Sequence, residues 1–225
     1  MKGSDSSPAP VLTIRGVQFN PPAGLKLDVE LRAGESRAVV LPDDELFLLD
    51  AMISGDRVPP SGEVTLCGCN PAEDGIWNGH LSGKVARTFS PLFGRGCWLE
   101  NLDVDENIML ASLMRGEEPG AVRERALKLA LRFGLAALPD TRRAATRVEA
   151  LTICQWIRAF LVNDASIFLM IDALRNAPEN AMAALVQECR ARREKGAAFL
   201  WLLPKGRGRH LAMLGVSEVI EPEDP

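Results

Sequence analysis

Histidine and cysteine are too few and too scattered in this sequence to predict a disulfide framework or a metal site. Among 225 residues there are two histidines and five cysteines, and only Cys67 and Cys69 lie close together. An odd number of dispersed cysteines does not suit paired disulfides. No second close pair of cysteine or histidine accompanies Cys67 and Cys69, so we expect free thiols and no bound metal.

Long apolar runs are also absent. The longest run, around residues 159–174, is interrupted by Asn163 and Asp164 and falls short of the roughly 18–20 residues that span a bilayer. The first ten residues, MKGSDSSPAP, lack the apolar segment of a signal peptide. We therefore expect a short disordered lead over residues 1–10 and a protein that is not exported.

An excess of positive charge is missing as well. The formal net charge is −4, which argues against a general nucleic-acid binder. The hydrophobic content of 47% and the charged content of 25% lie in the range of ordinary globular proteins. A chain of this length suffices for one large α/β domain.

The segment 37–55, RAVVLPDDELFLLDAMISG, has the pattern of a buried strand, a short turn and an apolar helix that ends near its final glycine. In many nucleotide-binding proteins such a unit binds phosphate through a glycine-rich loop, a lysine and a hydroxyl. This segment has no glycine before residue 55, no lysine, and no serine or threonine before residue 54. Three acids occupy the position of a polyphosphate and would repel it: Asp43, Asp44 and Glu45.

The remaining pattern predicts a mixed α/β fold. Strands are expected over residues 11–14, 25–31, 63–67 and 84–89, followed by mostly helical sequence over residues 103–160. Asp103, with Glu106 three residues later, is an expected N-cap, and Gly134 an expected C-cap. The end of the chain is expected to form β-α-β structure: strand 167–171, helix 178–195, strand 197–203 and a last strand 217–220.

In this order, the elements resemble the ATPase subunit of ATP-binding cassette (ABC) transporters over residues 11–222. The resemblance is carried by six stretches: 12–19, 27–39, 61–68, 98–108, 163–174 and 196–203. It implies one domain with a P-loop NTPase-like ABC ATPase fold. The mixed β-sheet core would cover residues 11–90 and 164–222, with an antiparallel β subdomain and an α-helical subdomain over about residues 91–163.

The residues that bind phosphate in that family are replaced here. Counting without gaps, Asp44 and Leu46 fall on Walker A glycines, as does Leu41, and Phe47 falls on the Walker A lysine. Leu48 and Leu49 fall on the hydroxyl pair. The degenerate Walker A region is therefore Leu41, Pro42, Asp43, Asp44, Glu45, Leu46, Phe47 and Leu48.

Other family motifs are degenerate too. Ser90 falls on the Q-loop glutamine, and Pro204 on the switch histidine. The signature motif is replaced by residues 150–155, ALTICQ, which contain no glycine. The Walker B motif can be aligned in two registers: Asp172 replaces either the catalytic glutamate or the Mg²⁺ aspartate, and in the second case Ala173 replaces the glutamate. One of the two carboxylates is missing in either register.

The resemblance and these losses together imply a non-catalytic subunit, a pseudo-ATPase, with no catalytic residues and with ATP and Mg²⁺ not expected as cofactors. It would dock from the cytoplasmic side on a membrane permease or an intact ABC ATPase subunit, in a structural or regulatory role, with a dimer as one arrangement. Two alternatives remain: a transport ATPase in which Asp172, Asp43 or Asp44 holds Mg²⁺, and a free-standing regulatory binding protein.

Three further surface features have two readings each. Phe93 and Trp98 lie in the segment that contacts the permease in that family, but they could equally pack in the core. Asp43 and Asp44 are expected to cap the following helix, with a cation or a basic partner as the alternative. The basic segment 205–210 is expected to be a solvated loop, with an anionic partner or lipid headgroups as the alternative.

Overall fold

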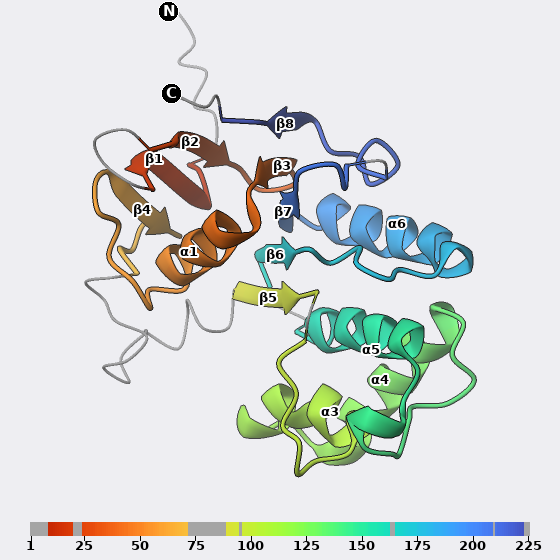
Figure 1. Ribbon diagram of the computed structural model, residues 1–225. Coiled ribbons are helices and arrows are strands. Elements are labelled where there is room, and N and C mark those ends of the chain that lie inside the picture. Colours follow the sequence, from red (N-terminus) through yellow and green to blue (C-terminus); the bar gives the residue numbers. More distant parts are fainter. Residues whose placement is uncertain are drawn as a thin grey trace, which may run out of the picture.

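The computed structural model describes residues 9–19, 24–71, 89–94, 96–162, 165–208 and 210–222. The expected lead up to residue 8, the loop 72–83 and the strand residues 84–88 therefore lie outside the described residues. Figure 1 shows two sheets on one side of the molecule and a group of helices on the other. Within the described residues, no helix is both long and apolar enough to cross a membrane.

The N-terminal part forms an antiparallel sheet. It contains β1 (Leu12–Gln18), β2 (Lys26–Leu31) and β4 (Glu63–Leu66), in the order β2-β1-β4. Along β2, Leu27, Val29 and Leu31 are buried. Their alternation with polar residues explains why this strand was predictable from a period of two.

The second sheet is parallel and forms the centre of the molecule. Its order is β5 (Phe89–Phe93), β6 (Ile167–Ile171), β7 (Ala198–Pro204), β3 (Ser36–Leu41) and β8 (Glu218–Ile220). Every residue of β6 and β7 is buried. Both faces of these strands are covered, which is why they appear in the sequence as continuous apolar runs.

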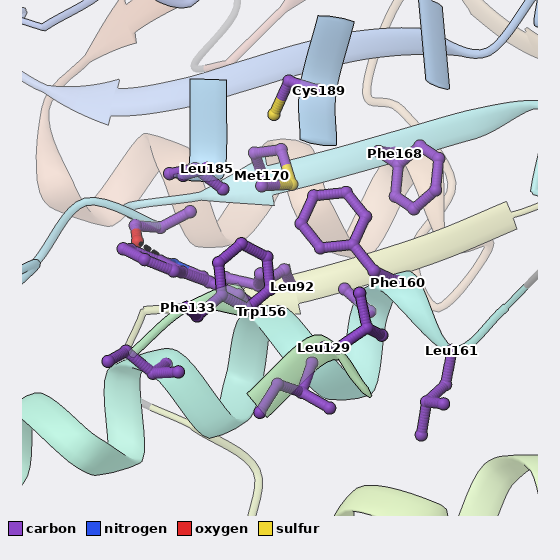
Figure 2. Close-up of a cluster of buried hydrophobic side chains, with 14 of the residues drawn as sticks. Leu92, Leu129, Phe133, Trp156, Phe160, Leu161, Phe168, Met170, Leu185 and Cys189 are labelled. Atoms are coloured by element: carbon purple, nitrogen blue, oxygen red, sulfur yellow. Dashed lines mark hydrogen bonds between the residues drawn. The ribbon is translucent and has the colours of Figure 1, made fainter. Parts of the chain in front are cut away.

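Two hydrophobic clusters cover the two faces of this sheet. On one face, Leu169 and Leu200 pack with α1 (Asp43–Ile53) and the antiparallel sheet. On the other face, Met170 and Trp201 pack with the later helices. Figure 2 shows the second cluster, in which Phe160, Phe168 and Met170 lie together with side chains of the helices. Adjacent residues of one strand thus belong to opposite clusters.

The helical part contains α3 (Val104–Met114), α4 (Pro119–Arg132), η2 (Arg143–Ala145) and α5 (Val148–Phe160), and α6 (Glu179–Glu194) packs on the sheet. Asp103 and Glu106 form the predicted capping box at the start of α3. Gly134 has a φ of +88° after α4, as expected for its C-cap position. The α/β fold class is confirmed, with a parallel sheet and a separate antiparallel sheet.

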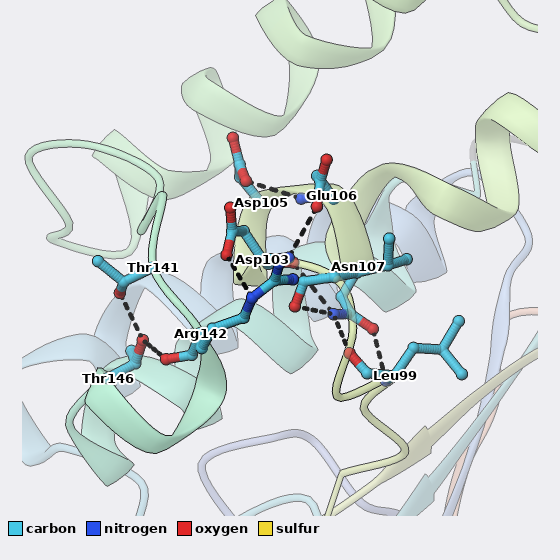
Figure 3. A network of polar contacts seen from close by, with 9 residues as sticks. Leu99, Asp103, Asp105, Glu106, Asn107, Thr141, Arg142 and Thr146 are labelled. Carbon is cyan, nitrogen blue, oxygen red and sulfur yellow. Dashed lines mark hydrogen bonds and ion pairs between the residues drawn. The ribbon is translucent and has the colours of Figure 1, made fainter.

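The segment before α3 is held by one buried amide. Asn107 donates from Nδ2 to the carbonyl oxygens of Leu99, Leu102 and Asp103 and accepts from the Leu99 N–H at 2.8 Å. Figure 3 shows this network together with the capping box and the Asp103–Arg142 ion pair. Asn107 therefore fixes the path of the chain between the sheet and the helices.

Candidate functional site

Four parallel strands end at one edge of the central sheet. Their last residues are Leu41 of β3, Phe93 of β5, Ile171 of β6 and Pro204 of β7. In open α/β sheets, ligands bind outside the carboxyl ends of the strands. The residues that follow these ends therefore make up the candidate site.

The connection from β3 to α1 is a single residue. β3 ends at Leu41 and α1 begins at Asp43, so only Pro42 lies between them. A phosphate-binding loop is longer, because several of its backbone N–H groups must surround the anion. Leu41 and Leu46 are buried, and Phe47 is 47% exposed on the first turns of α1. The connection between this strand and this helix therefore consists of Pro42 alone.

The acids at this connection belong to the helix. Pro42 is the N-cap, so Asp43, Asp44 and Glu45 form the first turn and do not occupy the capping position expected for the two aspartates. Their charges are favourable there because the N-terminal end of a helix carries partial positive charge. Leu48 follows on the next turn and packs partly against the cluster around α1.

A small cavity marks the position where the strand ends meet α1. Its volume is about 30 Å³, and its lining includes Leu46, Phe47, Phe93 and Pro204 together with Asp43 and Asp172. This space is about that of one water molecule. It is far smaller than the roughly 300–1,000 Å³ of sites for small organic ligands.

Asp172 is the carboxylate at the centre of this edge. It is 8% exposed, follows directly after β6 and has a φ of +47°, in the left-handed region. Its backbone N–H donates to the Leu202 carbonyl at 2.8 Å. Burial raises its pKa above the ordinary value, while the guanidinium groups of Arg207 and Arg175 oppose that shift.

Arg207 occupies the acceptor atoms of Asp172. Its Nη1 lies 3.0 Å from one carboxylate oxygen and 3.1 Å from the other. Arg175 lies further away, at 3.7 Å. Residues 205–208 are exposed, as expected for a solvated loop, and Arg207 in addition supplies a cation to the largely buried Asp172. Sequence spacing gave no signal for this pair, because its members are 35 residues apart.

Gly94 is a second residue that the sequence did not single out. A Cβ atom at this position would lie 2.0 Å from the Asp172 carbonyl oxygen. The Gly94 N–H also donates to the Ile171 carbonyl at 2.7 Å. Only glycine allows the end of β5 to approach Asp172 this closely.

Ser90 and Ala173 are both buried in the interior of the protein. Ser90 was expected just after a strand, but β5 continues to Phe93 and buries Ser90, whose hydroxyl donates to the Ala159 carbonyl at 2.9 Å. Ala173 is buried in the cluster around the helices, and its carbonyl accepts from Trp156 Nε1 at 2.9 Å. Ser90 therefore does not point from a loop toward Asp172.

Phe93 and Trp98 line different depressions. Phe93 lines the small cavity beside Asp172, whereas Trp98 lines a groove of about 290 Å³ with Val148, Leu151 and Gln155. The Arg158 guanidinium lies 5.2 Å from the centre of the Trp98 ring. The two aromatic residues are thus not brought together, and each packs partly against a different cluster.

The groove contains the segment that replaces the signature motif. Gln155 is buried at the groove, and its Oε1 has no hydrogen-bond partner among the described residues. Thr152 donates to the carbonyls of Val148 and Arg175 at 3.1 and 3.2 Å. Within the described residues there is no group of three or more side chains of the types that bind metal.

Comparison with known proteins identifies the fold. No family model and no curated protein matches the sequence. Among solved structures, an ATP-binding subunit of an ABC transporter is similar with a TM-score of 0.77 and 16% identity, over 95% of this chain and 86% of that one.

Two other solved structures are similar to this chain over most of its length. One is cbiO1 from Clostridium perfringens, part of the ABC transporter complex cbiONQ, with a TM-score of 0.70, 12% identity and coverage of 96% and 86%. The other is an ATP-binding cassette of an ABC transporter in its ADP conformation, with a TM-score of 0.69, 15% identity and coverage of 96% and 89%. The chain therefore has the fold of the ATP-binding subunits of ABC transporters.

Proposed function

We propose that this protein is a non-catalytic subunit of a membrane transport complex, a pseudo-ATPase with a structural or regulatory role. The observation that carries the proposal is the edge of the sheet where the cassette fold would hold nucleotide. There, one residue connects β3 to α1, and a cavity of about 30 Å³ remains. Phosphoryl transfer depends on donors positioned around the phosphates, and a connection of one residue provides no loop of backbone N–H groups for that purpose.

The ion pair between Asp172 and Arg207 supports the same proposal. A Mg²⁺ ion would need the carboxylate of Asp172, and Arg207 already lies against both of its oxygens. Asp172 shares its cavity with the start of α1, whereas Ala173 packs on the other side among the helices. We therefore assign Asp172 to the position of the Mg²⁺ aspartate and Ala173 to that of the missing glutamate.

The docking face of this subunit would be the groove beside Trp98. Its lining combines Trp98, Leu151 and the half-exposed Val148, and Leu99 next to it is 50% exposed. Exposed apolar side chains around a groove suit a partner segment. The partner would be a permease or an intact ATPase subunit, and the protein would lie on the cytoplasmic face of the membrane.

Equilibrium binding of a fluorescent ATP analogue with Mg²⁺ tests the proposal. We expect no saturable binding at micromolar concentration, whereas an intact cassette measured in parallel should bind. Micromolar affinity would instead support a transport ATPase with a remodelled site, which the shared cavity of Asp43 and Asp172 favours.

Co-purification of the tagged chain with a membrane protein, reduced by Trp98→Ala, would separate a transporter subunit from a free-standing regulator.

A further inference from the structure

A large cationic cleft lies apart from the strand-end site. Its volume is about 780 Å³, and it lies between α4, the end of α5 and the end of α6. The small cavity beside Asp172 and the Trp98 groove share no lining residues with this cleft. Its size falls within the roughly 300–1,000 Å³ of sites for small ligands.

Positive charge dominates the walls of this cleft. Among the described residues, the lining contains five cations and one acid: Arg125, Lys128, Arg132, Arg192, Lys195 and Glu188. Arg125, Lys128 and Arg132 come from α4, whereas Arg192 and Lys195 come from the end of α6. A ligand that contacts both walls would therefore bridge these two parts of the molecule.

Part of this charge is structural. Glu188 is 4% exposed and pairs with both Arg132 and Arg192. Arg192 also donates to the Phe160 carbonyl at 2.7 Å, at the end of α5. Carbonyl ends of helices attract cations, so these contacts explain why Arg192 is present without a ligand.

The remaining charge exceeds what the fold needs. Arg125 pairs with Glu117, and Lys128 pairs with Glu124 at 2.6 Å, but both members of the second pair are more than two-thirds exposed. Such exposed pairs contribute little and are easily exchanged. Lys195 has no ion-pair partner among the described residues.

Arg132 has guanidinium N–H groups that can donate hydrogen bonds to a ligand in the cleft. Its guanidinium has five N–H donors, and its only hydrogen bond among the described residues goes to Glu188. The side chain is 52% exposed, so its other donors can be reached from the cleft. Guanidinium and ammonium groups together are the usual ligands of phosphate in proteins.

We propose that this cleft binds a small phosphorylated molecule. Its phosphate would contact Lys195, Lys128 and the free donors of Arg132, all of which line the cleft. The proposal does not depend on whether the protein binds ATP at the strand ends.

Calorimetric titration of the full chain with inorganic pyrophosphate at constant ionic strength tests this. We expect saturable one-to-one binding that is about tenfold or more weaker in the double variant Lys128→Gln/Lys195→Gln. Arg190→Gln, which removes an exposed charge on α6 outside the cleft, is the matched control and should change the affinity by less than about twofold. Absence of saturation, or an equal loss in the control, would overturn the proposal.

A second variant gives an effect of opposite sign. Glu188→Gln removes the acid that the described part of the lining contains and releases two guanidinium groups, so pyrophosphate should bind more tightly. An unchanged affinity would mean that the cleft only supports the fold. Sedimentation with phosphatidylglycerol vesicles tests whether the cleft binds a lipid headgroup instead. The proposal would also be overturned if the protein sedimented with the vesicles, pyrophosphate did not displace it, and pyrophosphate did not bind in solution.

Discussion

At the scale of single residues, Arg207 pairs with both carboxylate oxygens of the largely buried Asp172. Arg207→Ala leaves a largely buried carboxylate with only the more distant Arg175. We expect a loss of about 1–2 kcal/mol in the free energy of unfolding, less than for a fully buried pair because Arg207 is 43% exposed. Urea denaturation measures it, with Arg190→Ala, which breaks an exposed pair on α6, as the control.

The same variant should also shift the titration of Asp172. Burial raises its pKa, and Arg207 is the largest opposing cause, so removal of Arg207 should raise the pKa further. The stability lost in Arg207→Ala should therefore shrink as the pH falls and Asp172 becomes neutral. A loss that is independent of pH would mean that Arg207 acts by packing alone.

Asp50 is a residue whose charge opposes folding. Burial raises its pKa from 3.8 to about 6, partly opposed by a hydrogen bond from Ser54 at 3.3 Å. Because the folded state favours the protonated form, this group stabilises the fold below pH 3.8 and loses that contribution as the pH rises toward 6. We expect Asp50→Asn to stabilise by about 1–2 kcal/mol at pH 7.5 and by almost nothing near pH 3.5.

Urea unfolding of the variant and the wild type at both pH values checks this. Asp56→Asn is the control, because the Asp56 charge is the smallest of the three causes of the Asp50 shift. An equal gain at both pH values would show that the amide, and not the lost charge, stabilises the helix.

At the scale of elements, Asn107 connects the segment before α3 to that helix. Asn107→Leu has a similar volume but removes the hydrogen bonds of the amide. The Leu99 and Asp103 carbonyls keep backbone donors, whereas the Leu102 carbonyl and the Leu99 N–H lose the partner that the amide provides. We expect a loss of about 2–3 kcal/mol and much faster hydrogen exchange at the Leu99 amide. Asp103→Ala, which removes only the cap and one ion pair, should lose about 1 kcal/mol and leave the Leu99 amide protected.

Most elements were predictable because a local pattern determined them. The continuous apolar run 167–171 is β6 with the expected bounds, and the capping box at Asp103 marks the start of α3. Strand β5 continues four residues beyond the predicted strand end at residue 89 and includes Pro91. Proline is tolerated there because β5 is an edge strand, and its missing N–H costs no ladder bond on the outer side.

The site was less predictable than the elements that hold it. The lack of glycine over residues 37–54 was visible in the sequence, because it is a local feature. The ion pair of Asp172 with Arg207 and the close approach of Gly94 to Asp172 both join segments distant in sequence. No periodicity or motif marks such contacts, so only the folded arrangement reveals them.

At the scale of the whole molecule, one hydrophobic cluster joins the sheet to the helical part. Cys154 on α5 and Cys189 on α6 are both buried in it. Burial raises the pKa of Cys154 to about 12 and raises that of Cys189 as well. The thiolate is the reactive form, so both should be inert in the folded protein, whereas the exposed Cys67 and Cys97 should react at once.

Labelling of the two buried thiols therefore reports on cooperativity. Because a shared cluster holds α5 against the sheet that carries α6, we expect Cys154 and Cys189 to become reactive at the same urea concentration and the same rate. Peptide-resolved mass spectrometry after pulses of a thiol reagent measures both in one sample. Earlier reaction of Cys154 would mean that the helical part opens independently, and the cationic cleft between α4, α5 and α6 would then open with it.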